Sequence, residues 1–152
     1  MVFQKIKENH AKQISILIKK TFIEFVAHTF TNVAKNEFIS HINEENIMNL
    51  INDYAGYVAI TDSNIVGVIM AKQDKNKITA LFVDKKHHHK GIATKLVNKI
   101  ISDFKKQGAK SIRCWASFYA VPFYQHQGFK KTRGVVKTKK GYTYQPMKKI
   151  IC

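Results

Sequence analysis

Apolar and polar positions follow two different rhythms along the chain, and together they predict a fold with both helices and strands. Residues 11–28 carry apolar side chains three and four positions apart, as on one face of a helix. Residues 33–49 repeat this spacing more weakly and predict a second helix. The runs 56–61 and 64–73 are rich in β-branched residues and are separated by Asp-Ser-Asn, so they predict a hairpin.

The second half of the chain continues with a strand, a loop and a helix. A strand is predicted at 78–83 and a loop at 84–90, followed by an amphipathic helix that begins close to Gly91 and ends before Gly108. The later elements are all short and bounded by turn residues: a strand at 111–116, a helix at 120–128, and strands near 129–137 and 143–148. This order predicts an α/β (α+β) fold with one mixed sheet.

Length and composition favour one globular domain over residues 1–152. With 45% hydrophobic residues, the chain can bury a substantial core. The two cysteines, Cys114 and Cys152, are too few for a disulfide framework and fit a reducing compartment. Neither a signal peptide nor an apolar run of bilayer length is visible. We therefore expect a soluble cytoplasmic protein without a membrane partner.

The formal charge of +16 predicts an anionic ligand, substrate or surface. Only two of the 26 basic residues are arginine, and the lysines are spread along the chain. A nucleic-acid groove usually has a dense basic face with stacking aromatic residues. A basic nucleic-acid-binding protein is therefore an alternative that rests on charge alone.

The stretch KKHHHKGIAT, residues 85–94, raises three readings: a metal site, a solvated basic loop or a phosphate-binding loop. A helix start leaves backbone N–H groups unpaired and attracts anions, and the small residues Gly91 and Ala93 permit close approach. Lys86, His88 and Lys90 add donors. Three adjacent histidines point in different directions and have no further ligand at metal spacing, so no metal is expected. The phosphate reading is favoured.

Two segments in this half resemble the GNAT superfamily of N-acetyltransferases. Residues 83–93 resemble its segment A, R/Q-x-x-G-x-G/A, and residues 116–129, ASFYAVPFYQHQGF, are similar to its segment B. In segment A, His88 falls on the Arg/Gln position, with Gly91 and Ala93 on the small positions. The matching positions of segment B are Ala120, Phe123, Tyr124, Gly128 and Phe129.

The resemblance implies a mostly antiparallel sheet, flanked by helices, that splays open between its fourth and fifth strands, here 78–83 and 111–115. It also implies that acetyl-CoA is the cosubstrate and lies in that cleft. The backbone that it assigns to the pantetheine arm is Leu81, Phe82 and Val83. The backbone N–H groups that it assigns to the pyrophosphate are those of His88, His89, Lys90, Gly91, Ile92, Ala93 and Thr94.

The resemblance also implies roles in catalysis. Tyr124 would be the general acid that protonates the departing thiolate, although core packing is an alternative for it and Tyr119 is a nearby substitute. The backbone N–H of Val83 would meet the oxyanion. Ser117 would contact the cofactor arm, and it could equally cap the following helix.

A general base is not evident, because the strand at 78–83 contains no carboxylate. A water chain, Tyr57, His28 and Asp84 all stay open, and an amine that is already neutral needs no base.

The favoured function is that of an acyltransferase, an acetyl-CoA-dependent N-acetyltransferase acting on a primary amine. A small molecule is the favoured acceptor, although a protein N-terminus or lysine stays open. Polycationic acceptors call for acidic walls, and the chain has only 10 acidic residues, so acidic or neutral amines are preferred. The alternative of a different class is an inactive CoA-binding regulatory module. The resemblance suggests a monomer or a homodimer.

Overall fold

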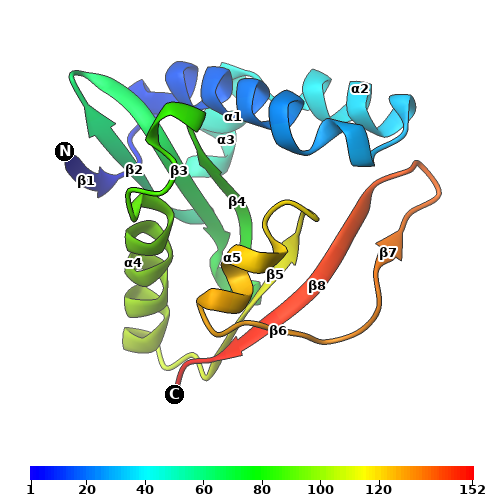
Figure 1. Cartoon of the computed structure of the whole chain (residues 1–152). Helices are drawn as coiled ribbons and strands as arrows, with labels where there is room; N and C mark the ends of the chain where they lie inside the picture. Colours follow the sequence, from blue (N-terminus) through cyan, green and yellow to red (C-terminus); the bar gives the residue numbers. More distant parts are fainter.

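The computed structural model describes residues 1–152 and is built around one eight-stranded sheet (Figure 1). The strand order is β1-β2-β3-β4-β5-β8-β6, with β7 beside β8, and only the β4–β5 pair is parallel. The strands are β1 Val2–Lys5, β2 Tyr54–Thr61, β3 Asn64–Lys72, β4 Lys77–Val83, β5 Ser111–Ala116, β6 Lys130–Lys131, β7 Val136–Lys137 and β8 Thr143–Ile150. The helices are α1 Ala11–Phe25, α2 Asn32–His41, α3 Glu44–Ile51, α4 Ile92–Lys106 and α5 Val121–His126.

The helices cover both faces of the sheet and bury a separate apolar cluster on each (Figure 1). On one face, α1 and α3 pack on side chains of β2 and β3 such as Val58 and Val68. On the other face, the amphipathic stripe of α4, which includes Leu96 and Ile100, packs on Ile69. The predicted mixed fold with flanking helices is thereby confirmed. No helix of this fold has the length and apolar character needed to cross a membrane.

The predicted hairpin is formed by β2 and β3, which the two-residue turn of Asp62 and Ser63 connects. Both turn residues have positive φ, 50° and 64°. This conformation matches the twist of a tight hairpin, and short polar residues tolerate it well.

The predicted splay between the fourth and fifth strands is confirmed. β4 and β5 pair at only two positions, Lys77 with Arg113 and Ile78 with Cys114. Immediately after them, Thr79 has no partner on β3, since Ile78 pairs with Ala71 and Ala80 with Met70. Such a bulge bends a strand, so β4 turns away from β5 at this point and leaves a cleft between the two strands.

Three elements differ from the sequence-based expectation. The strand β1 was missed, because four residues at a sheet edge are too short to show a period. The second helix, expected over 33–49, is divided into α2 and α3, and Asn43 caps α3 by accepting a hydrogen bond from the Asn46 N–H at 2.8 Å. The strand expected at 129–137 is reduced to the two-residue strands β6 and β7.

Candidate functional site

The splay opens into a cleft with a volume of about 680 Å³ between β4, the start of α4, the β5–α5 loop and α1. Among the predicted cofactor-binding residues, only Lys90 does not line it. The predicted residues that do are Leu81, Phe82, Val83, His88, His89, Gly91, Ile92, Ala93, Thr94, Ser117 and Tyr124.

The upper half of β4 presents a free backbone edge to this cleft. In an antiparallel pair, residues that exchange backbone hydrogen bonds alternate with residues that do not. The N–H of Asp84 donates to the carbonyl of Val66 at 2.8 Å, so the N–H and C=O groups of Val83 point away from β3. Leu81, two residues earlier in the same register, does likewise. Both N–H groups are therefore available to a ligand in the cleft, whereas sequence reasoning had named only that of Val83 for the oxyanion.

The loop before α4 forms a cradle of unpaired donors. Six successive backbone N–H groups, from His89 to Thr94, have no acceptor within the chain, and the first bonded amide is that of Lys95. His89 and Gly91 have positive φ, 61° and 79°, so the chain curls around these groups. A Cβ at Gly91 would meet nothing within 4 Å. The cradle therefore faces open space, where an anion can approach the backbone.

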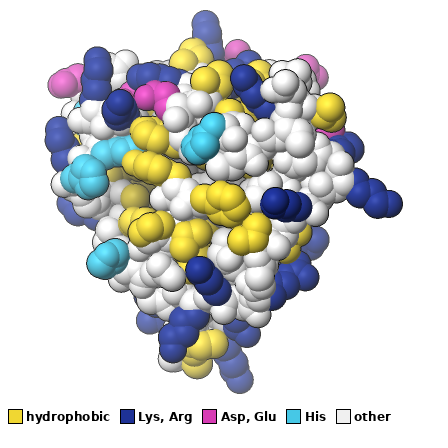
Figure 2. Space-filling model, turned by 45° about the vertical axis from the view of Figure 1, so that its right-hand side comes forward, with side chains coloured by type: hydrophobic (Ala, Val, Ile, Leu, Met, Phe, Trp, Pro, Cys, Tyr) yellow, Lys and Arg dark blue, Asp and Glu magenta, His cyan; other side chains and the backbone are white.

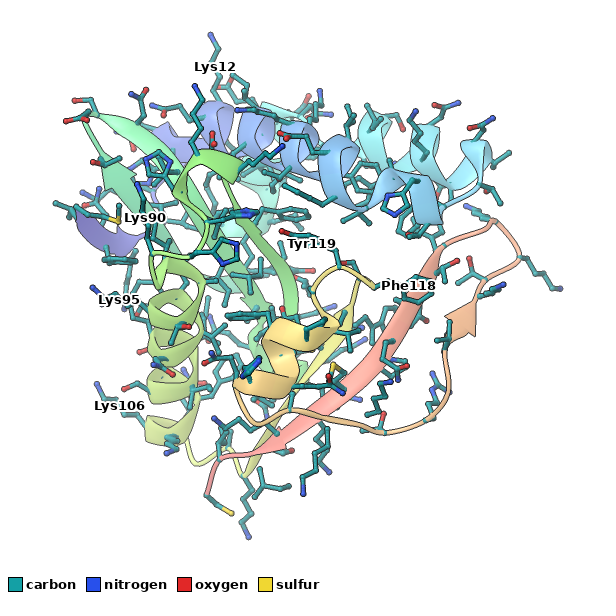
Figure 3. All side chains as sticks on the ribbon, in the orientation of Figure 1. Lys12, Lys90, Lys95, Lys106, Phe118 and Tyr119 are labelled. Atoms are coloured by element: carbon teal, nitrogen blue, oxygen red, sulfur yellow. The ribbon has the colours of Figure 1, made fainter.

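His88 and Tyr119 bridge the mouth of the splay. The Nε2 atom of His88 donates to the carbonyl oxygen of Val83 at 2.7 Å, so the other ring nitrogen, Nδ1, can accept from the Tyr119 hydroxyl at 3.3 Å. The Tyr119 ring stacks on Phe25 of α1 with 4.5 Å between centroids. Tyr119 thus reaches from the β5–α5 loop to both sides of the cleft (Figure 3). The sequence pointed to neither contact.

Tyr124 lies at the floor of the cleft, 4% exposed, between the rings of Phe123 and Phe129. Its hydroxyl makes no hydrogen bond within the chain. Burial, with a smaller contribution from Cys114, raises the pKa of this phenol well above its usual value. The hydroxyl therefore stays protonated at neutral pH and can donate to a group bound in the cleft.

None of the three side chains considered as a base lines the cleft. Tyr57 lies on the α4 face and donates to Asp103 at 2.6 Å, and its pKa is raised to about 12, mainly by burial. Asp84 accepts from the Lys86 N–H, which lowers its pKa, and pairs with Lys20 at 3.1 Å. His28 is exposed. A base role for these side chains would need a relay through solvent.

One polar atom in the cleft is left without a partner. The Nδ1 atom of His87 is the only buried side-chain nitrogen or oxygen in the chain that lacks a hydrogen bond. His87 lines the cleft beside the cradle, but its Nδ1 atom is covered, so a ligand could bond to it only if the ring turned. No group of three or more His, Cys, Asp or Glu side chains is placed to hold a metal ion.

The remaining wall of the cleft carries seven aromatic side chains and no carboxylate. Sequence reasoning missed this part, because its residues come from α1, α2, β5, β8 and the segments just before α2 and β8, and meet only in the fold. Phe22 stacks on Phe38 with 4.1 Å between centroids, and Trp115 stacks on Tyr144 at 4.2 Å. Figure 2 shows apolar side chains gathered at the centre of this face. The aromatic residues of this wall are Phe22, Phe25, Phe30, Phe38, Trp115, Tyr142 and Tyr144.

Comparison with solved structures agrees with this geometry. A GCN5-related N-acetyltransferase from Rhodopseudomonas palustris superposes with a TM-score of 0.85 over 98% of this chain and 94% of its own, at 14% identity. A PaiA N-acetyltransferase from Thermoplasma acidophilum in complex with coenzyme A gives 0.81 over 98% of both chains, at 21% identity. An aminoglycoside 6'-N-acetyltransferase from Enterococcus faecium gives 0.75 over 100% and 98%, at 17% identity.

These identities show a shared fold and leave the acceptor open. No curated protein matches the sequence. Residues 26–151 match the family model described as the acetyltransferase (GNAT) domain, and this range holds the cradle, the free strand edge and Tyr124. The chain therefore belongs to the GNAT acetyltransferases.

Proposed function

We propose that this protein transfers the acetyl group of acetyl-CoA to a primary amine by direct attack of the amine on the thioester. One observation carries the proposal: the row of free N–H groups from His89 to Thr94 continues into the free backbone edge of β4 and ends near the unbonded hydroxyl of Tyr124. A pyrophosphate, an extended amide-bearing arm and a thiol need these three features in this order.

The donor half of the cleft fits the parts of acetyl-CoA. The pyrophosphate would accept hydrogen bonds from the cradle, supported by the positive end of the α4 dipole. The arm would pair with the backbone of Leu81 and Val83 as an added strand does. The side chain of His88 now holds the Val83 carbonyl, so it would have to turn away when the arm binds. Ser117 lies opposite in the cleft lining and is a candidate contact for the arm.

The chemistry would then depend on the chain's own donors. Acetyl-CoA supplies an activated carbonyl carbon, the amine nitrogen forms the new bond, and the carbon–sulfur bond breaks. The N–H of Val83, or that of Leu81, would stabilise the negative charge that develops on the carbonyl oxygen. The Tyr124 hydroxyl would give its proton to the departing thiolate. An amine that enters neutral loses one proton to solvent after it has formed the new bond. The Tyr124 phenolate takes one proton back from solvent, so the reaction releases no net proton.

A calorimetric titration with acetyl-CoA tests the donor half. We expect binding in the micromolar range and its loss in Gly91→Glu, because a carboxylate would stand in the space where the phosphates bind and Gly91 has a left-handed φ of 79°. The matched control is Gly108→Glu, since Gly108 also has a left-handed φ and open surroundings, but lies past the far end of α4. Wild-type protein that does not bind acetyl-CoA would refute the proposal.

Release of the CoA thiol in the presence of amines tests the chemistry separately. The missing carboxylate on β4 motivates the alternative of a regulatory module that binds CoA without turnover. Thiol release that depends on an amine excludes that alternative. Tight binding without release with any amine favours it.

A further inference from the structure

Five basic side chains form one row across five neighbouring strands. Lys72 on β3 pairs with Lys77 on β4, Lys77 with Arg113 on β5, Arg113 with Lys148 on β8, and Lys148 with Lys130 on β6. Residues in register on adjacent strands point to the same face of a sheet. With about 4.8 Å between strands, the row is about 19 Å long.

This row has no acidic partner. The two ion pairs of the protein are Lys20 with Asp84 and Lys140 with Glu37, and neither includes a residue of the row. Burial, and then the positive charges of Arg113, Lys75 and Lys72, lower the pKa of Lys77 to about 8. A partly buried ammonium without a counter-ion is costly. The cations of the row therefore lack a negatively charged partner within the chain.

The row also adjoins the cleft. The ammonium nitrogen of Lys77 lies 2.9 Å from the centroid of the Trp115 ring, and both Trp115 and the bulge residue Thr79 line the cleft. The guanidinium of Arg113 donates to the Lys75 carbonyl at 3.2 Å, and this hydrogen bond restrains the Arg113 side chain. In Figure 2, lysine and arginine side chains surround the apolar centre of this face, and its lower half shows no acidic side chain. A ligand that extends out of the aromatic part of the cleft beside Trp115 would therefore contact the cations of the row.

We propose that the row, here called the cationic row, binds acidic side chains of a peptide whose amine is the acceptor. The inference rests on the proposed function and narrows its acceptor to a chain with an N-terminal or lysine amine and several carboxylates. One carboxylate could satisfy only one or two of these cations, whereas an extended peptide of about six residues spans the row. A polyamine or an aminoglycoside would be repelled by the cationic row.

Two other occupants fit less well. A single-stranded nucleic acid needs open aromatic faces on which bases can stack. Trp115, the aromatic residue beside the row, is 52% exposed, but its ring already packs against Lys77 and Tyr144. A second copy of the chain carries the same charge of +16 and would be repelled.

The test uses two peptides of equal length, Ala-Phe-Gly-Glu-Glu-Glu and Ala-Phe-Gly-Gln-Gln-Gln, and a third with phosphoserine in place of glutamate. Acetylation is followed by CoA release, and binding by the anisotropy of labelled peptide with CoA present. The protein variants are Lys77→Gln/Arg113→Gln and, as a control with equal charge loss, Lys12→Gln/Lys106→Gln, whose side chains lie on α1 and at the end of α4 (Figure 3).

We expect the acidic peptide to have a KM about tenfold lower than the glutamine peptide, and Lys77→Gln/Arg113→Gln to remove this preference, since each partly exposed ion pair contributes a few-fold. The control variant should keep it, and the KM for acetyl-CoA should not change. Equal KM values for the two peptides, or equal losses in both variants, would overturn the inference. So would an oligonucleotide of equal charge that binds the row more tightly. Stronger binding of the phosphoserine peptide would support the inference, because phosphoserine carries more negative charge than glutamate. Acidic-peptide binding without turnover of this or any other amine would refute the proposed function, whereas turnover of other amines but not of the bound peptide would overturn the inference.

Discussion

The donor and acceptor halves of the cleft are built from different parts of the chain. The donor half consists of backbone groups on one continuous segment, the free edge of β4 and the N–H groups from His89 to Thr94. The acceptor half consists of side chains from α1, α2, β5, β8 and the segments just before α2 and β8. Backbone groups are the same in every sequence, so the donor half can keep one ligand while side chains vary. The acceptor half can change its ligand by substitution without disturbing the donor half.

The largest effect that we expect concerns Tyr124, which lies where the donor and acceptor halves meet. Tyr124→Phe should lower kcat by about 10²- to 10⁴-fold, because the departing thiolate loses its proton donor. The KM for acetyl-CoA should stay near the wild-type value. The Tyr124 hydroxyl makes no hydrogen bond within the chain, so the variant should fold normally. Steady-state kinetics and a thermal melt measure both quantities.

Burial gives this experiment a pH signature. Because the pKa of Tyr124 is raised, its hydroxyl keeps its proton as the pH rises through 9, and the wild-type kcat should show no alkaline loss from this group. A kcat of Tyr124→Phe equal to that of the wild type would remove Tyr124 from the mechanism. Tyr119→Phe is the matched comparison, since Tyr119 lines the same cleft but bonds to His88.

The second effect concerns stability. It distinguishes aromatic residues of the acceptor half that also belong to the core from those that only line the cleft. Phe22 lines the cleft, yet it is only 1% exposed and packs on Phe30 and Phe38. Phe22→Ala should lower the free energy of unfolding by about 3–5 kcal/mol, as other large core truncations do. Phe25→Ala removes a half-buried ring that stacks on Tyr119, so it should cost less. Urea denaturation of both variants checks the order, and equal losses would show that the acceptor wall is uniformly structural.

The sequence predicted the donor half of the cleft better than the acceptor half. The donor half was readable because Val83, His88, Gly91 and Ala93 lie in one short segment with fixed spacing. All ten residues between 81 and 94 that line the cleft belong to the same strand–loop–helix unit. The splay was inferred from resemblance alone, since the bulge at Thr79 leaves no mark in the residue pattern.

The acceptor half could not be read in this way. Lys77 and Lys148 are 71 positions apart, and each looks like an ordinary surface lysine until strand register places both beside Arg113. The dispersal of lysines, which counted against a concentrated basic surface, is compatible with a row that only the sheet assembles. The interpretation of the sequence as one without a dense basic face was therefore incomplete. Strand order and register supply the information that spacing lacks.

A smaller effect concerns the charge of Lys77 and its attraction to an acidic peptide. Since the pKa of Lys77 is about 8, its ammonium is mostly charged at pH 7 and mostly neutral at pH 9. Attraction to an acidic peptide is thus present below pH 8 and is lost as the pH rises, and binding should weaken about three- to fivefold over this interval. The groups that act on Lys77 are Arg113, Lys75, Lys72 and the Cys114 thiol, whose own pKa burial raises to about 12.

Anisotropy titrations of the labelled acidic peptide at pH 7 and pH 9 measure this change. A bound anion itself raises the pKa of Lys77, so the peptide should take up protons when it binds near pH 8. Lys77→Gln should bind more weakly at pH 7 and show a flatter profile. A wild-type profile as flat as that of the variant would separate Lys77 from peptide binding.

The smallest effect decides between two roles for Ser117, at the border of the two halves. Its Oγ atom accepts from the Ala120 N–H at 3.3 Å, as a residue that caps the start of α5 would, and the residue also lines the cleft. If capping is its role, Ser117→Ala should lower the free energy of unfolding by about 0.5–1 kcal/mol and leave the KM for acetyl-CoA unchanged. If it also holds the cofactor arm, KM should rise as well, by a few-fold for one neutral hydrogen bond. We expect the second result, because Ser117 is the acceptor in its bond to Ala120, so its hydroxyl proton stays free to point into the cleft. A KM that does not move in a variant of lowered stability would make Ser117 a helix cap alone.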